Sequence, residues 1–114
     1  MTDASGELNP LSVPMSVAEL VEYQSGSVVS RTIIKKPTGT VTLFAFAKGE
    51  GLSEHTAPFD ALVTILDGAA QITVGGEVHE VQSGEGLLLP ADIPHALHAS
   101  TPFKMMLVMI RSPQ

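Results

Sequence analysis

Residues 51–61 read GLSEHTAPFDA and residues 84–95 read GEGLLLPADIPH, and these two blocks carry the most specific pattern in the chain. Each block begins with glycine, contains proline and has one histidine, His55 in the first and His95 in the second. Glycine and proline set the backbone conformation at turns. Most of the pattern is therefore made of shape-setting residues, so it bears more directly on the fold than on the chemistry.

The segments around these blocks have the pattern of short β-strands. Turn-forming residues recur every eight to twelve positions, and β-rich runs lie between them at 28–36, 40–48, 61–66, 69–74, 78–82, 87–89, 95–99 and 104–110. Asp67-Gly68 and Gly75-Gly76 are predicted turns, and the second is a strong hairpin signal because both glycines can take positive φ. Short strands at this spacing predict an all-β sandwich or barrel.

The N-terminal part of the chain has a different pattern. Leu8–Pro14 contains two prolines and is predicted to be an extended arm. Ser16 and Glu19 form a capping-box pattern, which predicts a helix of about two turns. We therefore divide the chain into an N-terminal arm with a short helix, residues 1–27, and a β-barrel domain, residues 28–114.

Composition predicts a single soluble domain. The 114 residues are 44% hydrophobic and 16% charged, which is too apolar for intrinsic disorder. No more than 11 consecutive residues lack a charge, whereas a membrane-spanning helix needs roughly 20 apolar residues. Cysteine is absent, which excludes disulfides, thiolate nucleophiles and cysteine-based metal sites. The first ten residues lack the pattern of a secretory signal, so we expect a cytoplasmic protein.

Charge is distributed unevenly along the chain. Residues 49–103 contain eight carboxylates and no lysine or arginine, and the net charge is −6. Nucleic acids and anionic membranes bind clustered basic residues, so neither is an expected partner. The acidic segment contains both histidines and disfavours anionic ligands. A clamp for a phosphate or a sugar nucleotide would require the fold to bring in Arg31 or Lys104.

The two blocks resemble the two motifs of the cupin superfamily. The first motif is a glycine, a His-x-His pair, a glutamate and a closing glycine, here Gly68, and the second is a glycine, a proline and a closing histidine. The similarity extends over residues 40–111, with the intermotif spacing usual for small single-domain bacterial cupins. It implies an all-β double-stranded β-helix, also called a jelly roll or cupin barrel, that closes two sheets over a pocket. It also implies a homodimer.

Two of the four metal ligands that the family implies are absent. By position, the first histidine corresponds to His55 and the closing histidine to His95, but the second histidine and the glutamate fall on Ala57 and Ala61. His55 and His95 are therefore candidate ligands for iron, manganese, nickel or zinc, held weakly or not at all, and candidate acid–base catalysts. Asp60 is the one neighbouring carboxylate that could turn inward. No nucleotide cofactor is expected.

Strand alternation predicts which other residues face the pocket. If both histidines face inward, the predicted lining also includes Ala57, Ala61, Val63, Ile65 and Leu97. The strand at 40–48 contributes either Val41, Leu43 and Ala45 or Thr42, Phe44 and Phe46, and alternation leaves both sets open. Either set gives a mostly apolar cavity with two imidazoles, which is the usual form of a small-molecule site.

Three functions fit these features. The first is binding of a small, largely apolar or uncharged molecule in the barrel pocket. The second is a divalent-metal-dependent cupin enzyme, dioxygenase- or isomerase-like, that uses His55 and His95; a metal-free version would use the same residues as general base and acid. The third is a non-catalytic dimeric interaction or regulatory module. The sequence leaves open whether the protein is an enzyme.

Overall fold

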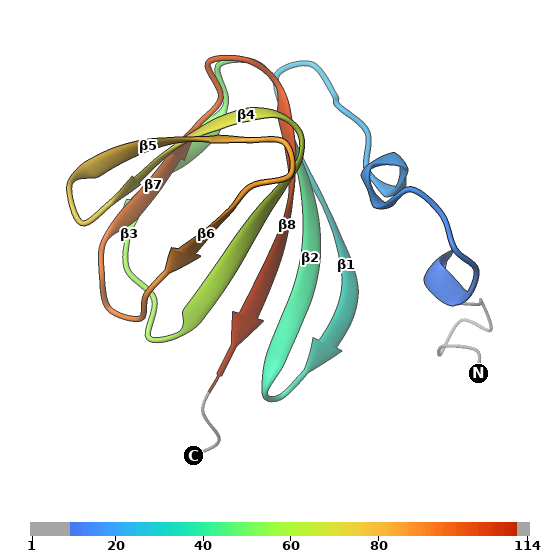
Figure 1. Ribbon diagram of the computed structural model, residues 1–114, viewed down its shortest axis with the longest axis horizontal. Coiled ribbons are helices and arrows are strands. Elements are labelled where there is room, and N and C mark those ends of the chain that lie inside the picture. Colours follow the sequence, from blue (N-terminus) through green and yellow to red (C-terminus); the bar gives the residue numbers. More distant parts are fainter. Residues whose placement is uncertain (1–9, 112–114) are drawn as a thin grey trace.

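Eight β-strands and two short 3-10 helices make up the described part of the chain, residues 10–111 of a computed structural model (Figure 1). In chain order the elements are η1 (Pro10–Ser12), η2 (Val17–Leu20), β1 (Val28–Lys36), β2 (Gly39–Phe46), β3 (Gly51–His55), β4 (Asp60–Val74), β5 (Glu77–Gln82), β6 (Gly86–Leu89), β7 (His95–His98) and β8 (Phe103–Ile110). The part of the predicted arm before Pro10 lies outside the described residues, as do residues 112–114. None of the described helices is long and apolar enough to cross a membrane.

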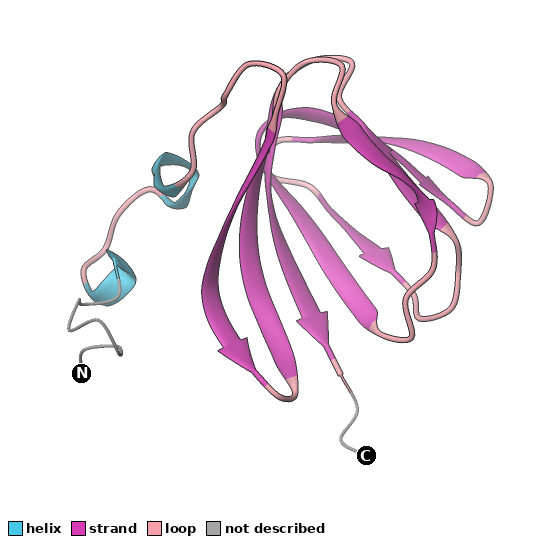
Figure 2. Cartoon of the chain, turned by 180° about the vertical axis from the view of Figure 1, so that it is seen from behind, coloured by secondary structure: helices cyan, strands magenta, loops and turns pink. Residues whose placement is uncertain are grey.

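The strands pair antiparallel and build two sheets that share one long strand. The first sheet, here called the β2 sheet, has the order β1-β2-β8-β4-β6, and the second, the β7 sheet, has the order β3-β7-β4-β5. The first part of β4 belongs to the β2 sheet and its last part, from Ala69, to the β7 sheet. The two sheets curl toward each other around a common interior (Figure 2). This is the all-β double-stranded β-helix that the sequence predicts.

Apolar side chains from the inner faces of both sheets fill the interior. They include Phe46, Val63, Ile65, Ile72, Leu97, Phe103 and Met105, each at most 5% exposed. The rings of Phe46 and Phe103 stack with their centroids 4.5 Å apart. Phe44 packs against the same core, whereas Leu43 belongs to a separate cluster on the outer side of the β2 sheet. The set with Thr42, Phe44 and Phe46 is therefore the one on the inner face of β2.

The predicted turn at Asp67-Gly68 is wrong, because β4 runs through these residues without a break. A register shift between Ile65 and Asp67 forms a bulge, and Gly68 pairs with Phe103 of β8. Gly68 has a φ of 73°, and a Cβ atom there would lie 2.2 Å from the carbonyl oxygen of Pro102. The glycine bends β4 from one sheet into the other where a side chain has no space.

Two further details concern the strand pattern. The hairpin at Gly75-Gly76 is confirmed, and both glycines have positive φ, 58° and 84°. Strand β3 is absent from the predicted runs, because all five of its residues are exposed and it therefore lacks the apolar alternation of a half-buried strand. It forms by pairing with β7.

The predicted two-turn helix is also wrong. The segment forms the single 3-10 turn η2, and Ser16 makes no side-chain cap. The consecutive residues Leu20 and Val21 are both buried in the cluster with Leu43 on the outer side of the β2 sheet, and Val21 is extended. The helix thus ends after one turn, where the chain packs both residues into this cluster.

Polar contacts attach this segment to the same outer face. Lys104 Nζ donates to the carbonyl oxygen of Ala18 at 2.8 Å, and Arg31 donates to that of Leu20 at 3.1 Å. The hydroxyl of Tyr23 donates to the Asp67 carboxylate, and burial raises the pKa of Tyr23, with the neighbouring carboxylate adding to the rise. Both basic residues named as possible phosphate clamps therefore act outside the barrel.

A row of apolar residues crosses the rest of this outer face. Ile34, Val41, Val108, Leu62 and Leu88 form one row across the five strands of the β2 sheet. Ile34, Leu62 and Leu88 are 46–54% exposed. Beside this row lies a shallow depression of about 190 Å³, whose lining includes Ile34, Lys36, Gly39 and Ile110. We call the row and this depression the outer apolar band.

Candidate functional site

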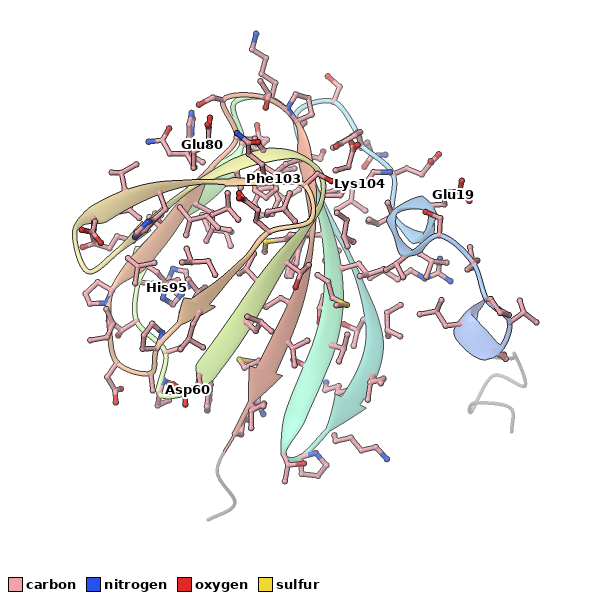
Figure 3. The ribbon with its side chains drawn as sticks, in the orientation of Figure 1. Glu19, Asp60, Glu80, His95, Phe103 and Lys104 are labelled. Atoms are coloured by element: carbon pink, nitrogen blue, oxygen red, sulfur yellow. The ribbon has the colours of Figure 1, made fainter. Side chains whose placement is uncertain are left out.

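The two histidines singled out in the sequence lie side by side at one end of the barrel. His55 ends β3 and His95 begins β7, and the two residues are partners in the register of these strands. Their Nε2 atoms are 3.1 Å apart, and the rings meet edge to face with centroids 4.4 Å apart. His95 is 8% exposed and lies within the curl of the two sheets (Figure 3), whereas His55 is exposed.

A backbone carbonyl oxygen lies near the outer nitrogen of each ring. Nδ1 of His55 lies 2.7 Å from the carbonyl oxygen of Ser53, and Nδ1 of His95 lies 3.3 Å from that of Ile93. A carbonyl only accepts, so the shorter contact assigns the Nδ1 proton to His55 and leaves a lone pair on its Nε2. His95 then donates its Nε2 proton to His55.

The environment of His95 keeps its ring neutral. Burial lowers the pKa of His95 below its ordinary value, and the neighbouring His55 adds to the lowering, while the Ile93 carbonyl acts in the opposite direction. The pair thus presents one buried neutral imidazole and one that is open to solvent. Neutral imidazoles are the form that binds metal ions and that accepts protons.

The spacing of the pair matches two positions around one metal ion. Two nitrogens that each lie about 2.1 Å from an ion, at a near right angle, are about 3.0 Å apart. With the protons of both rings on Nδ1, the carbonyls of Ser53 and Ile93 would orient both rings and leave both Nε2 lone pairs for an ion, the arrangement that supports metal-binding histidines. Within residues 10–111, however, no group of three histidine, aspartate or glutamate side chains is placed to hold a metal. The chain thus offers two ligands, and the other positions would belong to solvent or to a bound molecule.

Asp60 is used in another way. Its Oδ1 accepts a hydrogen bond from the backbone N–H of Ala91 at 2.9 Å, which ties the start of β4 to the loop between β6 and β7. Asp92, whose φ is 65°, donates its N–H to the Ala57 carbonyl at 2.8 Å in the same region. These contacts set the position of the loop that leads into His95.

The remaining predicted site residues separate into two groups. Ala57 and Ala61 are half-buried, and Ala61 packs against the barrel core beside Leu89 and Met109. Val63, Ile65 and Leu97 are buried deeper in that core. The small side chains therefore lie toward the end of the barrel that holds the histidines.

The family model for the cupin domain matches residues 42–111. The chain belongs to the cupin family. A conserved protein of unknown function from Streptococcus pyogenes, SPY1581, is 34% identical, with a TM-score of 0.86 over 90% of each chain. A cupin superfamily protein from Desulfitobacterium hafniense is 30% identical, with a TM-score of 0.85 over 90% of this chain and 94% of the other.

A third similar structure is a cupin 2 conserved barrel domain protein from Leptotrichia buccalis. It is 46% identical, with a TM-score of 0.82, and the match covers 85% of this chain but 47% of that chain. The present chain thus spans about half the length of this relative. A comparison with curated proteins finds no match.

Arg111 is a candidate site residue that was not predicted from the sequence. Arg111 directly follows β8, and its guanidinium carbon lies 4.9 Å from the ring centroid of Phe59, directly before β4. Its Nε is buried and has no hydrogen-bond partner. The signal was present in the alternation of β8, since Met105, Leu107, Met109 and Arg111 share one side of the chain. The apolar residues of this alternation end at Met109, so the pattern did not indicate that Arg111 continues it.

Proposed function

We propose that this cupin binds a small, largely apolar molecule at the end of the barrel that holds His55 and His95. The observation that carries the proposal is the histidine pair itself. Its Nε2 atoms face each other at 3.1 Å beside half-buried alanines, and one ring is buried and neutral. A mostly apolar surround with a few convergent polar groups is the usual form of a small-molecule site.

Filling the space beside the pair tests this function. In a thermal-shift screen with small apolar compounds, we expect at least one compound to raise the melting temperature of the wild-type protein, because binding to the native state stabilises it. Ala61→Leu and Ala57→Leu are each expected to abolish that shift. Thr64→Leu, which changes the outer side of the same strand β4, is the matched control and should keep it. An unchanged response in both alanine variants would favour the interaction-module hypothesis instead.

The second candidate function is metal-dependent catalysis. His55 and His95 would hold the ion through Nε2, and their 3.1 Å separation is the observation that favours it. A divalent ion bound there would act as a Lewis acid with open positions for substrate or dioxygen. The chain itself would orient the two rings through the carbonyls of Ser53 and Ile93.

We also propose that the outer apolar band packs against a second copy of the chain. Lys36, Gly39, Ile110 and Asp60 lie in one register row across β1, β2, β8 and β4. A two-fold axis along the strands between β2 and β8 would place Ile110 of one copy over Gly39 of the other and Lys36 over Asp60. The exposed side chain of Ile110 would contact the depression of the other copy, and the positive charge of Lys36 would lie opposite the negative charge of Asp60. Each contact occurs twice, as in an isologous interface.

Light scattering coupled to size exclusion tests this interface. The wild-type protein is expected to have twice the 12.0 kDa mass of the chain. Leu62→Glu, in the same row of the band, is expected to give a monomer because this two-fold axis would bury its unpaired charge against Ile34 of the other copy. Val78→Glu, which replaces a 59% exposed residue on the other sheet, should leave the mass unchanged. A monomeric wild type, or a dimeric Leu62→Glu variant, would contradict the proposal.

A further inference from the structure

We propose that the molecule bound in this barrel carries one carboxylate, which Arg111 holds at the open end of the pocket. The inference rests on the proposed small-molecule function and assigns its ligand class. By its sequence, the acidic segment, residues 49–103, is expected to disfavour anionic ligands. Arg111 follows that segment in the sequence, and the fold brings it back to the end of the barrel where the histidine pair lies.

The alternation of β8 places Arg111 on the inner side. Met105 and Leu107 pack into the barrel core, and alternate residues of a strand point the same way. On the neighbouring strand, Ala61 packs against the core and Phe59 is two residues before it. The contact of 4.9 Å between the Arg111 guanidinium carbon and the Phe59 ring centroid joins these two inward positions.

This position lies at the same end of the barrel as the histidine pair. Met109 pairs with Ala61, and Arg111 and Phe59 each lie two residues farther along, about 7 Å toward the open end. Asp60 accepts from the N–H of Ala91, in the loop that leads directly into His95. The guanidinium and the imidazoles therefore lie at one mouth, with Ala61 on the wall below.

The Nε atom of Arg111 lacks a hydrogen-bond partner within the described residues. This Nε is buried, and no carboxylate of residues 10–111 lies within 4.0 Å of the guanidinium. A buried donor without an acceptor costs free energy, whereas a carboxylate accepts from the planar guanidinium through two parallel hydrogen bonds. The guanidinium carbon lies over the ring of Phe59, a cation–π contact that holds the charged group in place.

The surroundings restrict the charge of the ligand. Asp60 and Asp92 belong to the same mouth, and residues 49–103 contribute eight carboxylates and no basic residue. A phosphate monoester carries two negative charges, and the single guanidinium would neutralise one of them. The surrounding carboxylates would repel the other. A monocarboxylate is neutralised by Arg111 alone. The structure thus favours a small monocarboxylic acid whose apolar body lies beside Ala61 and Leu107.

A thermal-shift and calorimetric screen with matched pairs of compounds tests the inference. Each pair is a monocarboxylic acid and its primary amide with the same apolar body, for example hexanoate with hexanamide and benzoate with benzamide. We expect at least one acid to bind the wild-type protein roughly tenfold more tightly than its amide, the difference that a charge-assisted hydrogen bond provides. Arg111→Met keeps the stem against Phe59 but removes the charge, and it should abolish the preference. Arg31→Met, on the outer face, is the matched control and should keep it.

The outcomes separate this inference from the proposed function. If amides bind as tightly as acids, or if Arg111→Met keeps the preference for the acid, the role of Arg111 is overturned while small-molecule binding stands. If no acid and no amide stabilises the wild-type protein, both the inference and the proposed function fail for ligands of this class. Melting curves of Arg111→Met without ligand show whether the variant is folded.

Discussion

The Gly68→Ala variant is expected to lose more than about 3 kcal/mol of folding stability, a large fraction of the about 5–15 kcal/mol that stabilises a typical domain. The left-handed φ of 73° alone costs a residue with a Cβ about 1–2 kcal/mol. The added Cβ would also lie 2.2 Å from the backbone oxygen of Pro102, which has little freedom to move because the next residue, Phe103, pairs with Gly68.

Urea denaturation followed by far-ultraviolet circular dichroism measures this loss, since the chain has no tryptophan. Gly76→Ala is the matched control. Gly76 has a φ of 84°, but nothing lies within 4 Å of the position of its Cβ, so only the backbone cost applies. Its expected loss is about 1–2 kcal/mol. Equal losses in the two variants would show that the contact with Pro102 does not restrict Gly68.

The Ala61→Glu variant is expected to convert a labile metal site into one that retains a divalent ion. With two histidines as its only ligands, the wild-type protein should take up zinc or manganese in excess metal and lose it on desalting. A carboxylate on the inner face of β4 adds a third ligand, as in cupins with the complete motif. The affinity should rise by more than the roughly 10- to 100-fold that outer-shell groups contribute to metal sites.

Elemental analysis after desalting measures the retained ion. Adding His95→Ala to Ala61→Glu should remove it again, because one of the Nε2 ligands is lost. Thr64→Glu puts a carboxylate on the outer side of the same strand and should retain none. If neither the wild-type protein nor Ala61→Glu takes up metal at any loading, the 3.1 Å arrangement of the imidazoles is unrelated to metal binding and the metal-dependent candidate falls.

Much of the fold could be predicted because it depends on local patterns. The alternation of apolar residues and the regular turns located most of the strands, and Gly75-Gly76 located a hairpin that needs positive φ at both positions. Two local predictions failed where tertiary contacts outweighed them. Gly68 bends a continuous strand against Pro102, and the capping-box pattern at Ser16 yields to the burial of Leu20 and Val21 together.

The candidate site could be predicted in part. The spacing of the motifs singled out His55 and His95, and the alanines at the vacated ligand positions were identified from the same blocks. The orientation of Asp60 toward Ala91 depends on a loop 31 residues away in the sequence and has no local signal. The same holds for the basic residues: Lys104 and Arg31 bind carbonyls of the N-terminal segment, and Arg111 lies against Phe59.

The sequence by itself determined the all-β barrel, the family and the two histidines, because strand alternation, turn residues and motif spacing are properties of short segments. Only the tertiary structure decided which face of β2 lines the interior, that the two Nε2 atoms lie 3.1 Å apart, and that Arg111 lies against Phe59. A strand has two faces that look alike in sequence, and the register between distant strands sets which one is inside. The proposed site depends on that register, because it brings together side chains from β3, β7, β4 and the end of β8.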